Sequence, residues 1–193
     1  MKYHPEALDP IVGFLRDIGF TVRYGAGAQG GFLPGVNIAA GALHVDPETL
    51  VGPGDLLHEA GHMAILPRRL HARMGRDLEA DMRAAIAAEA GPGMPADPLL
   101  SVPLQQGELM AQAWSYAAAL HLGVPLDCVF FPGSYHVDAY EGPHPMQRWL
   151  EAGTHHGLAG LARVGMTGFT GVFALMDDNG LPPFPHMTRW VQA

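Results

Sequence analysis

The chain has 193 residues, of which 48% are hydrophobic, and this is enough for one domain with a sizeable core. Its formal net charge of −8 argues against nucleic acid or an anionic membrane as the main partner. The single cysteine, Cys128, excludes both an intrachain disulfide and a thiolate-rich metal site. We therefore expect one domain over residues 1–193.

The first residues of the chain carry no apolar segment of the kind found in secretory signals. No apolar run approaches the roughly 20 residues that a membrane-spanning helix needs. The sequence therefore predicts a cytoplasmic protein with no membrane partner. It gives no firm indication of an oligomeric state.

The N-terminal part of the chain predicts one helix followed by three short strands. Apolar residues recur at helical spacing over residues 8–18, and Gly19 is placed to end that helix. Strands are predicted over residues 20–24, 35–39 and 42–45, with glycine-rich turns between them. We expect these strands to form a small antiparallel sheet, which makes the fold class α+β.

The helix that should follow this sheet contains the sequence His58-Glu59-Ala-Gly-His62. Residues four apart lie on the same helix face, so His58 and His62 point in the same direction. Two histidines at this spacing, with glutamate directly after the first, form the zinc-binding H-E-x-x-H motif. The motif predicts His58 and His62 as Zn²⁺ ligands and Glu59 as the general base.

The residues around the motif support a helix. Glycine and proline precede Asp55, which is a plausible N-cap or first-turn acid, and Pro67 can end the helix. Gly61 costs about 1 kcal/mol relative to alanine inside a helix. Such a glycine is tolerated where a second backbone has to approach closely.

Further helices are predicted in the second half of the chain. Residues 77–90 and 105–122 have strong helical composition, whereas 94–103 contains three prolines and predicts a loop. Prolines, glycines and aromatic residues over 130–145 predict an ordered loop beside a cleft. Two short helices complete the prediction, over 146–152 and 156–164.

A catalytic zinc site usually has three protein ligands, so one more residue is needed. The metzincin pattern would place a third histidine at position 68, which is Arg68 here, so that pattern is excluded. A glutamate from a later helix remains, and both Glu79 and Glu108 are candidates.

The residue one turn after each glutamate helps to choose between them. Gln112 follows Glu108 and can accept a hydrogen bond from a ligating histidine, which such histidines usually donate. Arg83 follows Glu79, has no acceptor and would bring positive charge toward the metal. The comparison favours Glu108 and leaves Glu79 as the alternative.

Together, the H-E-x-x-H segment and the segment Glu108-Leu-Met-Ala111 resemble the small gluzincins, a family of zinc metallopeptidases with an E-x-x-A second helix. The resemblance implies a zincin-like domain, with His58, His62 and Glu108 as zinc ligands and Glu59 as general base. It also implies that residues 36–45 form the sheet edge along the cleft. One departure is Gln112, where some gluzincins have aspartate, and a neutral residue there could lower metal affinity.

These inferences predict a zinc-dependent hydrolase of a peptide or amide bond in an unidentified peptide or protein substrate. The alternative is a non-catalytic metal-binding or regulatory protein that uses the same site. Glu59 favours catalysis, because a structural zinc site needs no base. The tetrahedral oxyanion also needs a donor. The later part of the chain offers four candidates that sequence does not separate: Tyr135, His136, Tyr140 and His155.

Overall fold

The computed structural model describes residues 1–193 and has an α+β fold of seven α-helices and one sheet of three strands. The α-helices are α1 (Leu8–Asp17), α2 (Gly54–Ala64), α3 (Arg68–His71), α4 (Leu78–Ala90), α5 (Pro98–Leu122), α6 (Pro145–Glu151) and α7 (His156–Arg163). The strands are β1 (Val22–Tyr24), β2 (Val36–Ala39) and β3 (Ala42–Val45).

The sheet has the order β1-β3-β2 and is mixed. Strands β2 and β3 form an antiparallel hairpin whose two turn residues, Ala40 and Gly41, have φ angles of 48° and 73°. Positive φ at both positions is typical of the tight turns that join twisted antiparallel strands. Strand β1 pairs in parallel with the other edge of β3, so the prediction of an antiparallel sheet was wrong for this pair. The connection from β1 to β3 spans residues 25–41 and includes β2, and this length allows the parallel pairing, because a parallel partner cannot be reached by a tight turn.

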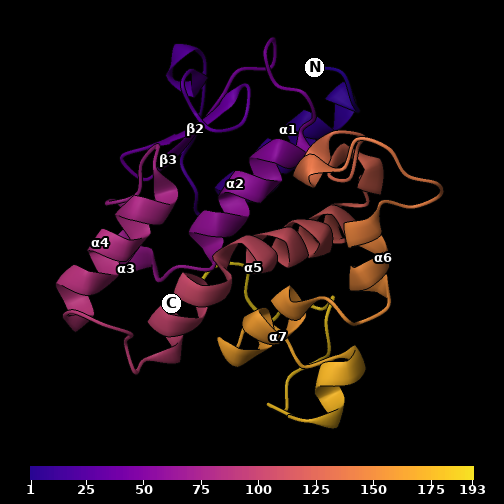
Figure 1. Cartoon of the computed structure of the whole chain (residues 1–193). Helices are drawn as coiled ribbons and strands as arrows, with labels where there is room; N and C mark the ends of the chain where they lie inside the picture. The colour runs from indigo at the N-terminus through magenta and orange to yellow at the C-terminus, as the bar shows by residue number, and fades with distance from the viewer.

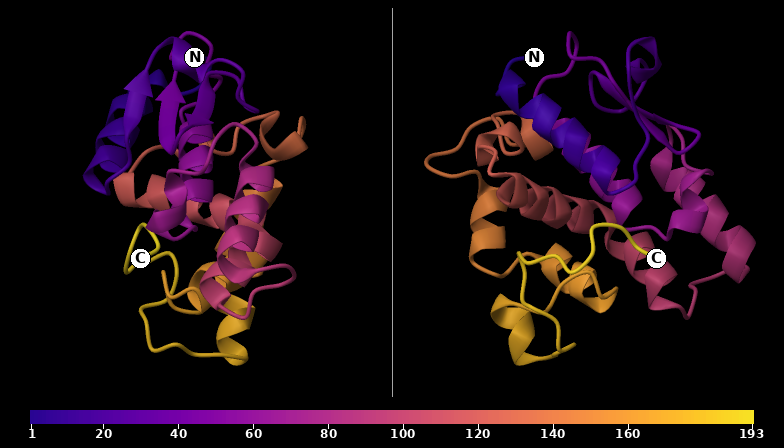
Figure 2. Two further views of the ribbon diagram at one scale, coloured as in Figure 1. Left: turned by 90° about the vertical axis from the view of Figure 1, so that its left-hand side faces the viewer. Right: turned by 180° about the vertical axis from the view of Figure 1, so that it is seen from behind.

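Helix α5 runs through the middle of the molecule, with α2 on one side and α7 on the other (Figure 1). Glycines allow both contacts. A Cβ at Gly61 of α2 would lie 3.0 Å from the carbonyl oxygen of Ala111, and one at Gly157 of α7 would overlap the carbonyl oxygen of Leu109. The close approach that the sequence indicated for Gly61 is therefore to α5. Helix α1 and the sheet lie at the N-terminal end of the molecule (Figure 2).

Helix α5 begins earlier than predicted. Asp97 accepts a hydrogen bond from the backbone N–H of Leu99, and Pro98 occupies the first turn, a position that tolerates proline. The predicted loop over 94–103 is therefore wrong from residue 98 onward. Backbone angles at Gln106 (φ −131°, ψ 17°) interrupt the helix three residues after Pro103, and the segment after this kink matches the predicted helix.

One connected cluster of 43 buried apolar residues joins the sheet to helices α1, α2, α5 and α7. Trp114 of α5 lies within it, and its indole N–H donates to the carbonyl oxygen of Trp190 at 2.9 Å. This contact fastens the C-terminal segment to the central helix. No helix combines the length and the apolar composition needed to cross a membrane.

Candidate metal centre

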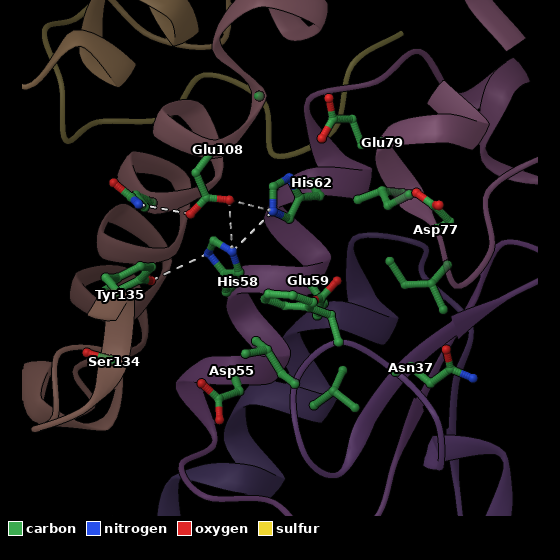
Figure 3. A pocket seen from close by; sticks show the side chains of 18 of the residues that line it. Asn37, Asp55, His58, Glu59, His62, Asp77, Glu79, Glu108, Ser134 and Tyr135 are labelled. Atoms are coloured by element: carbon green, nitrogen blue, oxygen red, sulfur yellow. Dashed lines mark hydrogen bonds and ion pairs between the residues drawn. The ribbon is translucent and has the colours of Figure 1, made fainter. Parts of the chain in front are cut away.

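The two histidines of the H-E-x-x-H motif lie one turn apart on α2, as predicted, and face α5 (Figure 3). Their Nε2 atoms are 3.1 Å apart. Helix α2 is almost entirely buried, so the two imidazoles are held on a rigid element with little freedom to turn away. His58 is 8% exposed, whereas His62 is partly accessible from the cleft beside it.

Glu108 reaches this pair from α5, just after the kink at Gln106 (Figure 3). Its Oε2 lies 3.4 Å from Nε2 of His58 and 3.2 Å from Nε2 of His62. Burial acts to raise the pKa of Glu108, but the hydrogen bonds and charges of the two histidines outweigh it and hold that pKa well below its usual range. The carboxylate is therefore ionised beside the two rings, although 56% of its side chain is exposed.

The three donor atoms form a nearly equilateral triangle with sides of 3.1, 3.2 and 3.4 Å. Tetrahedral zinc has ligand atoms about 2.0–2.1 Å from the ion, which places those atoms about 3.3 Å from one another. Two imidazole nitrogens and one carboxylate oxygen are also a ligand set that zinc accepts. The residues present therefore fit a zinc ion with one open coordination position.

The other candidate, Glu79, lines the same cleft but does not approach the histidines. Its carboxylate binds Arg83, one turn along α4, at 2.7 Å, and both side chains are exposed. The structure thus brings His58, His62 and Glu108 together, and it leaves Glu79 in a surface ion pair.

Glu59 also faces the cleft, beside the two histidines (Figure 3). Burial raises the pKa of Glu59, His62 opposes the rise and Glu108 adds to it. A raised pKa brings a carboxyl group closer to the pH at which it can exchange protons efficiently. The position and the chemistry of Glu59 both suit a proton acceptor.

The cleft has a volume of about 1240 Å³, which exceeds the usual range of small-molecule pockets. Its walls come from the loop at residues 31–34, strand β2, helices α2, α4 and α5, and residues 131–136. The loop over 130–145 therefore does lie beside a cleft, as predicted. Phe32 adds an exposed apolar ring to the wall of the cleft. Strand β2 lies in the same wall, and as an edge strand it can offer backbone hydrogen-bonding groups.

Tyr135 contributes a contact that the sequence did not indicate. Its hydroxyl lies 3.5 Å from Nδ1 of His58, the ring nitrogen on the side away from Glu108 (Figure 3). Burial raises the pKa of Tyr135 well above its ordinary value, so the phenol keeps its proton. Tyr135 and His136 both have positive φ angles, 50° and 60°, a strained conformation that is common at functional sites. No local pattern connects Tyr135 to His58, because the contact depends on how a loop folds over α2.

The structure separates the four candidates for an oxyanion donor. Tyr135 and His136 line the cleft. Tyr140 instead donates its hydroxyl to the carbonyl oxygen of Phe130 at 3.0 Å. His155 is 3% exposed and has both ring nitrogens within hydrogen-bonding distance of protein atoms. Tyr140 and His155 are therefore not available to a substrate in the cleft.

Gln112 has a different role from the one predicted. It was expected to accept a hydrogen bond from a ligating histidine, but its Nε2 donates to Oε1 of Glu108 at 2.9 Å. Its Oε1 lies 3.0 Å from Nε2 of His155. The prediction was wrong because residues one turn apart on the same helix contact each other first, and α7 supplies a second partner.

Comparison of the chain with models of protein families, with curated proteins and with solved structures finds no match. A function therefore has to be inferred from the geometry of the site.

Proposed function

We propose that this chain is a zinc-dependent hydrolase of a peptide or amide bond. The observation that carries the proposal is the triangle formed by Nε2 of His58, Nε2 of His62 and Oε2 of Glu108, with Glu59 beside it in a large cleft. A structural zinc site would need neither the additional carboxyl group nor an accessible cleft. The proposal includes a zincin-like domain of the gluzincin type, supported by the H-E-x-x-H motif on α2 and the glutamate on α5.

Zinc, when held by these three residues, supplies Lewis acidity toward a carbonyl group and toward water. Glu59 then takes a proton from the attacking water and passes it to the leaving amine. The carboxyl group suits this task because burial raises its pKa while His62 still favours its ionised form. Of the cleft-lining groups, Tyr135 and His136 are the candidates for donating a hydrogen bond to the oxyanion.

The ligand set is tested by zinc binding. Elemental analysis of protein purified without added metal should give about one equivalent of zinc. Glu108→Ala should weaken zinc binding by about ten-fold or more, as loss of a ligand requires, whereas Glu79→Ala should change it little. A wild-type protein with less than about a tenth of an equivalent and no uptake on titration would exclude the zinc site. The reverse order of the two variants would replace Glu108 with Glu79.

The hydrolase activity is tested with Glu59→Gln. A library of internally quenched fluorogenic peptides provides the substrate for the wild type. The variant should fold and bind zinc normally, yet lose at least about 100-fold in activity, because glutamine keeps the size but not the basicity. Glu48→Gln makes the same chemical change on an exposed loop and should leave activity unchanged. Full activity in Glu59→Gln would remove Glu59 as the base. No cleavage of any peptide by zinc-loaded protein would favour a non-catalytic metal-binding or regulatory role.

A further inference from the structure

A line of hydrogen bonds connects the N-terminus of α7 to the candidate metal centre. The backbone N–H of Gly157 lies 3.2 Å from Nδ1 of His155. Nε2 of His155 lies 3.0 Å from Oε1 of Gln112, and Nε2 of Gln112 lies 2.9 Å from Oε1 of Glu108. The line therefore ends on the carboxylate oxygen that does not face the two histidines.

The chemistry of the first donor fixes the direction of the whole line. A backbone N–H can only donate, so Nδ1 of His155 must carry a lone pair. The proton of the neutral ring then lies on Nε2, which donates to Oε1 of Gln112. The amide NH₂ of Gln112 is left to donate to Oε1 of Glu108. The histidine tautomer and the amide orientation thus follow from a single backbone group.

The two intermediate side chains are shielded from water, although Gln112 lies at the wall of the cleft. His155 is 3% exposed and Gln112 is 4% exposed. Hydrogen bonds between buried groups are strong, and a buried group that loses its partner is costly. If either side chain turned away, it would leave a buried polar group without a partner. The amide of Gln112 is therefore held in the orientation that donates to Glu108.

We propose that His155 is a positioning residue for Glu108 and acts through Gln112. The inference rests on the proposed zinc site. Gln112 binds Oε1 of Glu108, and the other oxygen, Oε2, is the one that faces the two histidines and is placed to bind the metal. A carboxylate held in this direction would offer one oxygen to zinc, and with three protein ligands a position would remain for water or substrate. The line is neutral, so it fixes the direction of the carboxylate without adding negative charge.

A comparison with His144 distinguishes this role from helix capping. His144 caps α6 in the same way, because its Nδ1 lies 3.2 Å from the backbone N–H of Met146. Its Nε2 faces the carbonyl oxygen of Ser134 at 3.4 Å. A buried histidine can therefore cap a helix in this fold with no connection to Glu108. What His155 has in addition is the bond from Nε2 to Gln112.

The proposal is tested by His155→Asn, which separates the two roles. Asparagine is a good N-cap and can still accept from the N–H of Gly157, but it is too short to reach Gln112. The variant should keep the cap of α7, lower the melting temperature of the zinc-free protein because the buried Oε1 of Gln112 loses its donor, and raise the dissociation constant for zinc by about ten-fold or more. His156→Asn changes the neighbouring exposed histidine, which packs on Phe173, and should leave both quantities unchanged.

The second test combines His155→Asn with Gln112→Met, a substitution that keeps the length of the side chain and removes its hydrogen bonds. If His155 acts through Gln112, adding His155→Asn to Gln112→Met should weaken zinc binding no further. Full additivity of the two changes would overturn the proposal, and so would wild-type zinc affinity in His155→Asn. A wild type that binds no zinc would instead overturn the proposed function on which this inference rests.

Nitrogen-15 NMR of the histidine rings gives a second measurement that needs no variant to fold. At neutral pH the His155 ring should show a protonated Nε2 and an unprotonated Nδ1. The opposite tautomer would be incompatible with the hydrogen bond from Gly157 and with donation to Gln112, and would overturn the proposal.

Discussion

Two carboxyl groups one turn apart on α2, Asp55 and Glu59, line the cleft and have raised pKa values. Burial is the main cause for both, and it raises the pKa of Asp55 to about 7. Only Glu59 lies beside the histidines (Figure 3). Asp55 is 9% exposed and has no cationic partner among the ion pairs of the structure, so its ionisation disfavours the folded state.

The shift at Asp55 predicts how stability depends on pH. An unfolded chain would release this proton near pH 3.8, whereas the folded protein holds it until about pH 7. The native state binds more protons in this window, so the contribution of Asp55 to the free energy of unfolding falls as pH rises through it. At about 1.4 kcal/mol per pKa unit, the full effect is on the order of 4 kcal/mol.

Asp55→Asn should remove this dependence. The zinc-free variant should match the wild type at about pH 4 and be more stable by a few kcal/mol at about pH 8. Urea unfolding at both pH values measures the difference, and subtracting the two curves cancels groups that the substitution does not touch. A difference that does not change with pH would show that folding does not raise the pKa of Asp55.

At the scale of elements, α5 holds the site together because two helices dock on it through glycines. Gly61 lets α2 approach Ala111, which places Glu108 opposite the two histidines. Gly157 lets α7 approach Leu109, which places His155 next to Gln112. The absence of a side chain at these two positions therefore matters more than the low helix propensity of glycine.

Gly157→Ala and Gly13→Ala should have opposite effects. A methyl group at Gly157 overlaps the Leu109 carbonyl oxygen and should destabilise the protein by about 1–3 kcal/mol or more. A methyl group at Gly13, in α1, meets nothing within 4 Å and should stabilise the helix by up to about 1 kcal/mol. Thermal or urea unfolding measures both. Equal effects would mean that α7 does not pack closely on α5.

For the whole molecule, the proposed zinc site exists only when distant parts of the chain have come together. His58 and His62 lie on α2, Glu108 lies on α5, and the buried core joins the two helices. A ligand that binds only the folded state stabilises it according to its concentration and affinity. At the proposed site, zinc binding is therefore coupled to folding.

Zinc should accordingly raise the melting temperature. A free zinc concentration 100 times the dissociation constant stabilises the folded state by about 2.7 kcal/mol. For a domain of this size, that corresponds to a rise of roughly 5–10 °C, which a chelator should reverse. Differential scanning calorimetry of the wild type and of Glu108→Ala measures it. A rise of the same size in Glu108→Ala would show that zinc stabilises the protein through another site.

The sequence by itself determined the local features. These features depend on the spacing of residues within one element. They are the helices that begin at Leu8 and Leu78, the strands near residues 22, 36 and 42, and the shared direction of His58 and His62. Such spacing is fixed by helix and strand periodicity, which neighbouring residues decide. The same reasoning missed the start of α5, because proline is tolerated in a first turn.

The tertiary structure decided what lies between elements. Three of these features join segments that are distant in sequence: the parallel pairing of β1, the approach of Glu108 rather than Glu79, and the position of Tyr135 at His58. The fourth is the donor role of Gln112, which depends on which of its possible partners lies nearby. No spacing rule reports such contacts, because they depend on which helix faces are buried together. Glu79 and Glu108 both lie on good helices, and only the docking of α5 against Gly61 brings one of them to the histidines.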